Sequence, residues 1–342
     1  MKRFHINLVF VFLVMHTFAQ AETDPLFSTT SPLDIAFSIS TKTIKNSKVD
    51  SVYFKEKMYY RNTAGITDSI KIGVKRRGNF RLEQCYFPPL WMKIDKKAGK
   101  NTLFEGNKKL KLVMPCDSRS ENNDLILREY VCYKLYEAVT SYSFKSRLVN
   151  IDFTDEKGRK SKDYQLKGIL IEDVDKTAKR CGGKTAPDVR ISGSALNDTC
   201  ALRFDLFQLM IANTDWSKRS QHNSKLINHN SGYIPLPYDF DMSGVVDAPY
   251  SVVSQVGDDK LPIESVRERY YRGYCTSNEI TQLVRKEFLS KQEKLMAVPD
   301  ELKGMLSNKE IEGIKTYLEK FFEILKYDKS FEAEIVSRCR TM

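Results

Sequence analysis

The sequence is poor in metal-binding side chains and, beyond its first segment, has no long hydrophobic run. Its 342 residues contain only four histidines, and no two of its seven cysteines have the C-x-x-C spacing of zinc sites. It also has no internal repeat, no low-complexity tract and no G-x-G-x-x-G loop. With 41% hydrophobic and 29% charged residues the composition is globular, which excludes disordered, collagen-like and coiled-coil proteins.

The chain carries an excess of positive charge. Its 55 Lys and Arg residues against 44 Asp and Glu residues give a net charge of +11, which favours polyanionic partners such as nucleotides, phosphoproteins, anionic glycans or lipid head groups. No nucleic-acid-binding motif accompanies this charge, so we expect no DNA or RNA partner. At roughly 150 residues per domain, the length allows about two domains.

The first 21 residues have the three parts of a secretory signal peptide. They are a basic start at Lys2 and Arg3, an apolar run at residues 6–18 and small residues around position 20. The apolar run of 13 residues is shorter than the roughly 20 needed to span a bilayer. We therefore expect an exported protein, secreted or periplasmic, with no membrane anchor after cleavage. It would start near Glu22, and loss of the two basic residues would lower its net charge to +9.

Export permits disulfide bonds, and an odd number of cysteines leaves at least one without an intrachain partner. Cys85 and Cys116 flank two strand-like runs at residues 90–95 and 110–114. Antiparallel pairing of those runs would bring the two cysteines together, so we predict this disulfide first. The weaker predictions are a pairing of Cys181 with Cys200, a pairing of Cys275 with Cys339, and a buried free thiol at Cys132 on the apolar face of a helix.

Alternating apolar and polar residues dominate the first half of the chain, and helical periodicity dominates the second. We predict an α+β fold with two lobes around a cleft. A β-rich N-terminal lobe would contain one long helix, and the C-terminal lobe would be mainly helical, with two short strands. The predicted segments are a signal peptide at 1–21, a flexible N-terminus at 22–32, the β-rich lobe at 33–174, a connector at 175–194 and the helical lobe at 195–342, which holds the catalytic loop and a metal-binding strand end.

Residues 213–241 contain the side chains that phosphoryl transfer requires. Asp215 follows an apolar helix, Asn223 comes eight residues later, and Asp239 and Asp241 follow a short predicted strand. The reaction needs a carboxylate for the attacking hydroxyl, oxygen ligands for Mg²⁺ and a cation for the phosphates. Mg²⁺ accepts a few hard oxygen ligands, which Asn and Asp supply. Each residue alone is better explained by a turn or a cap, but the ordered set favours a catalytic site.

This segment resembles the core of the spore coat protein H (CotH) kinases. The resemblance rests on Asn213-Thr214-Asp215-Trp216, His222-Asn223-Ser224-Lys225-Leu226 and Pro237-Tyr238-Asp239-Phe240-Asp241. Three upstream runs resemble other segments of the family in the same order: Arg76-Arg77-Gly78-Asn79, Asp124-Leu125-Ile126-Leu127-Arg128 and Lys167-Gly168-Ile169-Leu170-Ile171-Glu172. The family has an atypical protein-kinase-like fold and transfers phosphate from ATP to secreted proteins, so the resemblance implies that fold and activity here.

The resemblance also implies roles for the matching residues. Asp215 would be the catalytic carboxylate. Asn223, Asp239 and Asp241 would bind Mg²⁺, for which Mn²⁺ can substitute, and Glu172 would lie at a hinge near the adenine of ATP. The chain departs from the family at His222, where the family has asparagine.

The phosphate-binding cations are assigned less directly. Lys93 is the preferred lysine, because the apolar residues of its strand share one face and Lys93 points to the other. Lys111 on the neighbouring strand is the alternative. Arg77, before a glycine turn, can donate to phosphate oxygens or simply belong to a basic edge strand. Glu129 could pair with the lysine, although a surface position is favoured.

From these residues we predict an exported CotH-like kinase that transfers the γ-phosphate of ATP to a hydroxyl, on Ser or Thr of a secreted or surface protein. The positive charge would favour an acidic substrate. One alternative is a noncatalytic exported protein of the same fold that binds a polyanionic partner. Another is a kinase for a sugar or other small molecule, because a fold does not determine its substrate.

Overall fold

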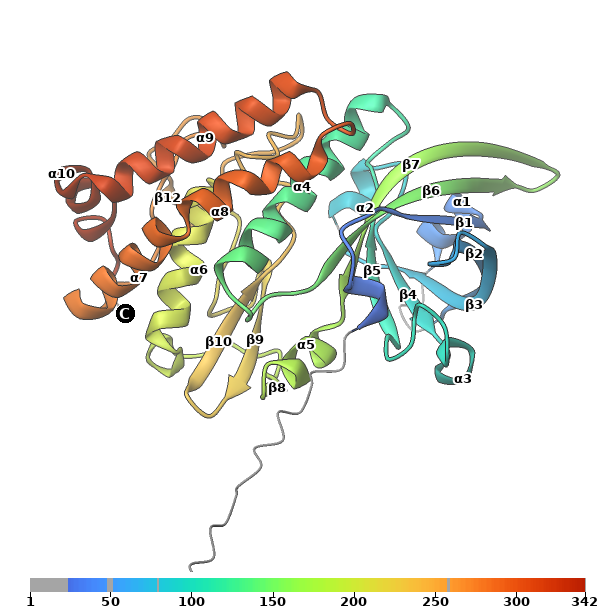
Figure 1. The fold of residues 1–342 in the computed structure, drawn as a ribbon, viewed down its shortest axis with the longest axis horizontal. Helices are drawn as coiled ribbons and strands as arrows, with labels where there is room; N and C mark the ends of the chain where they lie inside the picture. Colours follow the sequence, from blue (N-terminus) through green and yellow to red (C-terminus); the bar gives the residue numbers. More distant parts are fainter. Residues whose placement is uncertain (1–23, 48–51, 79, 257–258, 342) are drawn as a thin grey trace, which may run out of the picture.

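A β-barrel built from the first half of the chain lies beside an assembly of helices and a small sheet (Figure 1). The computed structural model describes residues 24–47, 52–78, 80–256 and 259–341. The barrel strands are β1 (Leu33–Ile39), β2 (Phe54–Arg61), β3 (Thr67–Arg76), β4 (Leu90–Ile94), β5 (Lys109–Val113), β6 (Ser146–Lys157) and β7 (Lys160–Glu172). The remaining strands are β8 (Lys184–Thr185), β9 (Ser224–His229), β10 (Gly232–Pro237), β11 (Gln255–Val256) and β12 (Asp259–Lys260).

Ten α-helices occur among the described residues. They are α1 (Thr41–Asn46), α2 (Phe80–Gln84), α3 (Lys96–Gly99), α4 (Ser120–Val139), α5 (Val174–Arg180), α6 (Asp198–Met210), α7 (Asn278–Ser290), α8 (Gln292–Ala297), α9 (Asn308–Lys326) and α10 (Asp328–Phe331). Shorter turns of helix are η1 (Pro25–Phe27), η2 (Gly193–Ala195), η3 (Val298–Leu302) and η4 (Glu332–Val336). No helix in these described ranges is long and apolar enough to cross a membrane.

The barrel closes because its first strand pairs with a strand far along the chain. The strand order is β1-β2-β3-β4-β5-β7-β6, and all neighbours are antiparallel except β1 and β6, which run parallel from Leu33 opposite Val149 to Ile39 opposite Asp155. Inward-facing side chains alternate with outward-facing ones along each strand. In β4, for example, Leu90, Met92 and Ile94 are buried in the barrel core.

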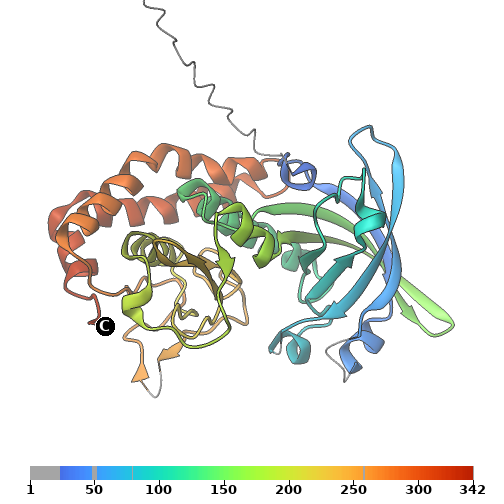
Figure 2. The same ribbon diagram turned by 90° about the horizontal axis from the view of Figure 1, so that it is seen from below.

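Helix α4 connects the barrel to the helical assembly. It packs against β6 and β7 on one side and against α8 and η3 on the other (Figure 1 and Figure 2). Buried residues lie all around the helix, which is typical of a helix enclosed by protein. Its apolar side chains belong to the same hydrophobic core as those of α6, α7 and α9.

The predicted two-lobed, protein-kinase-like fold with a helical C-terminal lobe is therefore wrong. The strands form a closed, mixed, seven-stranded barrel, and α4 shares its core with the later helices instead of belonging to the β-rich part. A three-stranded sheet, in the order β10-β9-β8, also lies within the second half. Alternating sequence patterns reveal each strand, but they do not reveal the parallel pairing of two strands far apart in the sequence.

Some local predictions agree with the structure and others differ from it. Strands β4 and β5 form the expected antiparallel hairpin, with Leu90 opposite Leu112. From residue 24 onward, the segment predicted to be flexible is anchored, because Leu26 is fully buried and its carbonyl accepts a hydrogen bond from Arg147 at 2.9 Å. The connector predicted for 175–194 contains most of α5 and strand β8. The signal peptide predicted for 1–21 lies outside the described residues.

Two disulfide bonds are present, and both were predicted. Cys85 pairs with Cys116 at the open end of the β4–β5 hairpin, and Cys275 pairs with Cys339. The three other cysteines are free: the predicted pairing of Cys181 with Cys200 is wrong, and Cys132 is the buried thiol that its helical position indicated. Disulfides persist in oxidising compartments, so this chemistry is consistent with an extracellular or periplasmic location.

Candidate functional site

Asp215 lies in a tight turn shortly after helix α6. The side-chain oxygen of Asn213 accepts a hydrogen bond from the N–H of Asp215, and its carbonyl oxygen accepts one from the indole N–H of Trp216, both at 2.9 Å. Trp216 is buried and packs edge-on against Phe204 of α6. The buried tryptophan therefore fixes the turn on the helix, and the Asp215 side chain keeps 27% of its surface exposed.

Three side chains hold the Asp215 carboxylate. His222 Nε2 lies 2.9 Å from one oxygen, the Ser254 hydroxyl donates to the same oxygen at 3.1 Å, and Asn223 Nδ2 donates to the other at 2.8 Å. Burial alone would raise the pKa of Asp215, but the hydrogen bond and charge of His222, together with Ser254 and Arg272, bring the pKa below its ordinary value. The same contact raises the pKa of His222. Asp215 is thus kept ionised and can accept a proton from a bound hydroxyl.

The β9–β10 hairpin brings Asn223 and Asp239 to the same end of the small sheet. Ser224 faces Pro237 in register, and the N–H of Tyr238 donates to the carbonyl oxygen of Asn223 at 3.2 Å. Asn223 and Asp239 both have left-handed backbones, with φ of 46° and 64°. Asn and Asp adopt this conformation more readily than other non-glycine residues, and such local strain clusters at functional sites.

Three acidic side chains near this hairpin influence one another. Asp241 is 7% exposed and Glu129 of α4 only 1%, so the surface position expected for Glu129 is wrong. Burial and the charge of Asp239 raise the pKa of Asp241 to about 6, and burial with both aspartates raises the pKa of Glu129 to about 8. Tyr250 donates to Asp241 at 3.3 Å, whereas Glu129 Oε1 is buried without a hydrogen-bond partner.

Two acids of this cluster, Asp239 and Asp241, are candidate ligands for a divalent cation. A cation held by these two aspartates would relieve the repulsion between their carboxylates. The Nδ2 group of Asn223 is engaged by Asp215, which leaves its Oδ1 as an oxygen ligand. In the described part of the chain, no group of three or more His, Cys, Asp or Glu side chains is placed to hold a metal. The predicted set of Asn223, Asp239 and Asp241 supplies the few hard oxygens that Mg²⁺ prefers.

Two arginines lie near these acids. Arg81 of α2, which the sequence did not single out, is 8% exposed and donates to the main-chain oxygen of Met114. Burial would lower the pKa of Arg81, but Tyr250 and the nearby carboxylates raise it overall. Arg77 follows β3, and its charge lowers the pKa of both Glu129 and Lys111, so it lies near the acids and the lysine together. Asn79, which belongs to the same predicted motif, lies outside the described residues.

The two candidate lysines lie on the same outer face of the barrel in different surroundings. Lys93 is exposed and lies over the ring of Tyr53, at 5.6 Å. Lys111 is 4% exposed, and its ammonium lies 3.6 Å from the ring centre of Tyr238, next to Asp239 in the chain. Burial, and then the charge of Arg77, lower the pKa of Lys111 well below its ordinary value, while Asp239 acts in the opposite direction. The structure therefore brings Lys111, and not Lys93, to the predicted metal ligands.

Glu172 lies at the end of β7, and its side chain is already engaged. Its carboxylate forms an ion pair with Arg180 at 2.7 Å, and it accepts hydrogen bonds from the Thr177 hydroxyl at 2.9 Å and the main-chain N–H of Lys145 at 3.2 Å. With 1% of its surface exposed, Glu172 joins β7 to α5. A nucleotide at this position would have to contact the neighbouring main chain instead of the Glu172 carboxylate.

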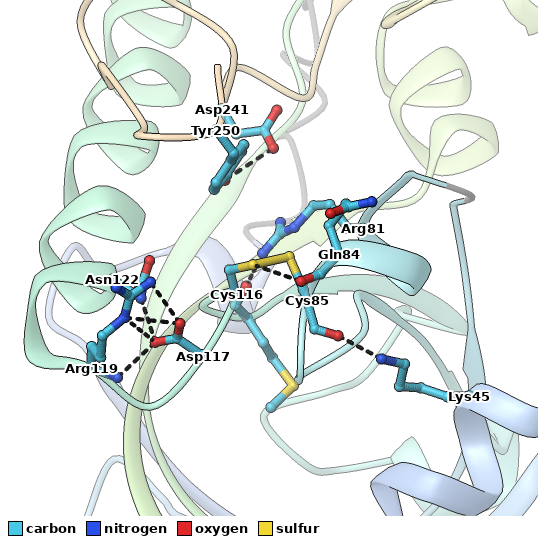
Figure 3. The surroundings of a disulfide bond; sticks show 11 residues. Lys45, Arg81, Gln84, Cys85, Cys116, Asp117, Arg119, Asn122, Asp241 and Tyr250 are labelled. Atoms are coloured by element: carbon cyan, nitrogen blue, oxygen red, sulfur yellow. Dashed lines mark hydrogen bonds and ion pairs between the residues drawn. A yellow bond between two sulfur atoms is a disulfide. The ribbon is translucent and has the colours of Figure 1, made fainter. Parts of the chain in front are cut away.

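The Cys85–Cys116 disulfide lies next to the acidic cluster. Figure 3 shows this bond with Arg81 above it and, farther above, Asp241 with Tyr250. Cys85 comes directly after the helix that carries Arg81, and Cys116 lies between β5 and α4. The disulfide therefore ties α2 to the β5–α4 connection, the two segments that flank the cluster from the barrel side.

The sequence matches no protein-family model, and no curated protein matches it at a significant level. The resemblance to the CotH kinases therefore stays a prediction, and the residues themselves have to support any function.

Proposed function

We propose that this chain is an exported phosphotransferase that depends on Mg²⁺ and moves the γ-phosphoryl group of ATP to a hydroxyl group. One observation carries the proposal: an ionised carboxylate, a cluster of acids and a buried lysine converge from separate parts of the chain. These residues are Asp215 with Asn223, Asp239 with Asp241, and Lys111. Because function belongs to a site and not to a fold, the barrel does not weaken the proposal.

Each residue has a role in the proposed reaction. Asp239, Asp241 and Asn223 Oδ1 would hold Mg²⁺, which supplies charge neutralisation at the phosphates when bound. Lys111 and Arg77 would bind phosphate oxygens, and burial strengthens the attraction between Lys111 and the phosphates. The carboxylate of Asp215 would orient the acceptor hydroxyl.

The proposed transfer balances without another reactant. The acceptor oxygen forms a bond to the γ-phosphorus while the bond from that phosphorus to the bridging oxygen of ADP breaks. The hydroxyl proton passes to Asp215, and ADP leaves with the bonding electrons. The resemblance implies Ser or Thr of a secreted protein as the acceptor.

Binding of ATP with Mg²⁺ tests the proposal without knowledge of the acceptor. Wild-type protein is expected to melt at a higher temperature with ATP and Mg²⁺ together than with either alone, because a ligand of the native state stabilises it. Asp239→Asn should lose this gain, and asparagine tolerates the left-handed backbone at that position.

Asp247→Asn is the matched control, because Asp247 also has a left-handed backbone, with φ of 53°, but forms a surface ion pair with Arg267. It should respond to ATP with Mg²⁺ as the wild type does. Absence of any response in the wild type would contradict the proposal and favour the noncatalytic alternative, in which the basic protein binds a polyanion.

The Asp215–His222 pair predicts a change in the pH profile of transfer. Transfer requires ionised Asp215, so the rate falls as the pH falls through the pKa of that carboxyl. His222→Gln removes the imidazolium charge that lowers this pKa, so the acidic limb of the rate profile should move to higher pH. His229→Gln should leave the limb in place, because His229 is a half-buried histidine that contacts Ser231. An unchanged limb in His222→Gln would refute the assignment of Asp215 as the base.

A further inference from the structure

A basic cavity opens beside Asp215. Its volume is about 480 Å³, which is within the range of small-molecule sites. Among the described residues that line it, Asp215 is the only acidic one. The basic residues that line it are Arg190, Lys218, Arg219, Arg272 and Arg340, together with His222.

Lys218 does not contribute free charge to this cavity. It is 1% exposed, and its ammonium donates to both carboxylate oxygens of Asp205 at 2.6 Å. Arg219 donates to the main-chain oxygen of Ile191 at 3.3 Å. A main-chain oxygen does not neutralise a guanidinium group, so Arg219 keeps its charge, as do Arg190, Arg272 and Arg340.

Arg272 is built into the wall of the cavity. It is 8% exposed, donates to the main-chain oxygen of Thr214, and lies over the ring of Trp216 at 5.2 Å. Its buried Nε has no hydrogen-bond partner. Burial, and then the charge of Arg340, lower the pKa of Arg272 to about 10. Both guanidinium groups line the same cavity and carry the same charge, so they repel each other.

Arg340 reaches the cavity from the last residues of the chain. Its N–H donates to the carbonyl oxygen of Gly273, and its carbonyl oxygen accepts from the N–H of Cys275, both at 2.9 Å. The adjacent disulfide between Cys339 and Cys275 fixes this pairing covalently. Its guanidinium lies 4.9 Å from the ring centre of Tyr274, and its buried Nε also lacks a hydrogen-bond partner.

Two arginines of like charge that line one cavity create a site for an anion. Arginine binds phosphate and carboxylate through paired N–H donors, and an anion between two guanidinium groups would relieve their repulsion. We infer that this cavity binds the acceptor of the transfer reaction, and that the acceptor carries a phosphate or carboxylate group that pairs with Arg272 and Arg340 while its hydroxyl faces Asp215. This inference rests on the proposed function and adds the substrate class.

Binding of inorganic phosphate tests the anion site separately from transfer. The measurement is calorimetric titration without ATP or Mg²⁺, in a Lys111→Met background that weakens the nucleotide phosphate site. Adding Arg340→Gln should lower phosphate affinity at least tenfold. Adding Arg338→Gln instead should leave phosphate affinity unchanged, because Arg338 lies two residues before Arg340 and pairs with Glu334 at 3.0 Å. Arg340→Gln is preferred to Arg272→Gln, because Arg272 also supports the Thr214 turn.

The KM values of candidate acceptors then distinguish the two sources of the anion. These measurements use protein without the Lys111→Met substitution. A serine peptide flanked by glutamates and a sugar phosphate are each compared with a neutral analogue, and one anionic acceptor should show the lower KM. Arg340→Gln should raise that KM while the affinity for ATP with Mg²⁺ stays unchanged. If the protein transfers phosphate but Arg340→Gln does not change phosphate affinity, the inferred acceptor site is wrong, whereas the proposed phosphotransferase function stands. Phosphate binding that depends on Arg340, without transfer to any acceptor, would overturn the phosphotransferase proposal and leave only an anion site.

Discussion

Asp215→Asn is expected to lower phosphoryl transfer by about three orders of magnitude and to leave the binding of ATP with Mg²⁺ unchanged. Removal of a positioned general base typically costs about 10²–10⁴ in rate, and three orders correspond to about 4 kcal/mol in the activation free energy. Binding should persist because the carboxylate of Asp215 is engaged by His222, Asn223 and Ser254 and is not among the proposed metal ligands. The measurement pairs single-turnover transfer with calorimetric binding of ATP and Mg²⁺.

The control for this variant is Asp328→Asn. Asp328 starts helix α10, which packs against α9 and η4, and its side chain is 93% exposed. This substitution should change neither rate nor binding. Transfer by Asp215→Asn at near wild-type rate would show that another group receives the proton and would remove Asp215 from the reaction.

Lys111→Met is expected to lower transfer by about two orders of magnitude, whereas Lys93→Met should have little effect. Lys111 is buried against Tyr238 beside the acidic cluster, and Lys93 is exposed over Tyr53. A cation held in a water-poor site stabilises transferring phosphate more strongly than one in solvent. The measurements are kcat and the KM for ATP in both variants.

Lys111→Met should not weaken the fold, and this separates a catalytic effect from a structural one. Burying an ammonium costs free energy, and methionine has a similar length without the charge. The melting temperature of Lys111→Met in the absence of nucleotide should therefore equal or exceed that of the wild type. If Lys93→Met lost transfer and Lys111→Met kept it, the lysine assignment made from the structure would be wrong.

Features that depend on neighbouring residues were predictable from the sequence. Period-two alternation at residues 90–95 and 110–114 predicted the β4–β5 hairpin, and the hairpin predicted the Cys85–Cys116 disulfide. Features that depend on contacts between distant residues were not predictable. The parallel pairing of β1 with β6 closes the barrel, and no local pattern indicates which distant strand completes a sheet. The prediction of a kinase-like fold was wrong because it did not include this pairing.

The same distinction between neighbouring and distant residues applies to the candidate site. The order of Asp215, Asn223 and Asp239 was visible in the sequence, because the turn after α6 and the β9–β10 hairpin belong to one continuous segment. The surface position predicted for Glu129 was wrong, and the burial of Lys111 could not be predicted, because the burial of both depends on how the barrel and α4 meet the hairpin. A charged residue that is buried by distant elements has the same sequence context as one in solvent.

The most direct test of the account is incubation of the purified protein, from Glu22 onward, with ATP labelled at the γ-phosphate. Incorporated phosphate is then located by mass spectrometry. The account predicts labelled Ser or Thr, either on the protein itself or on an added anionic acceptor, only when Mg²⁺ is present, and no label with Asp239→Asn. Labelling that persists in Asp239→Asn, or no labelling of any acceptor together with no stabilisation by ATP and Mg²⁺, would contradict it.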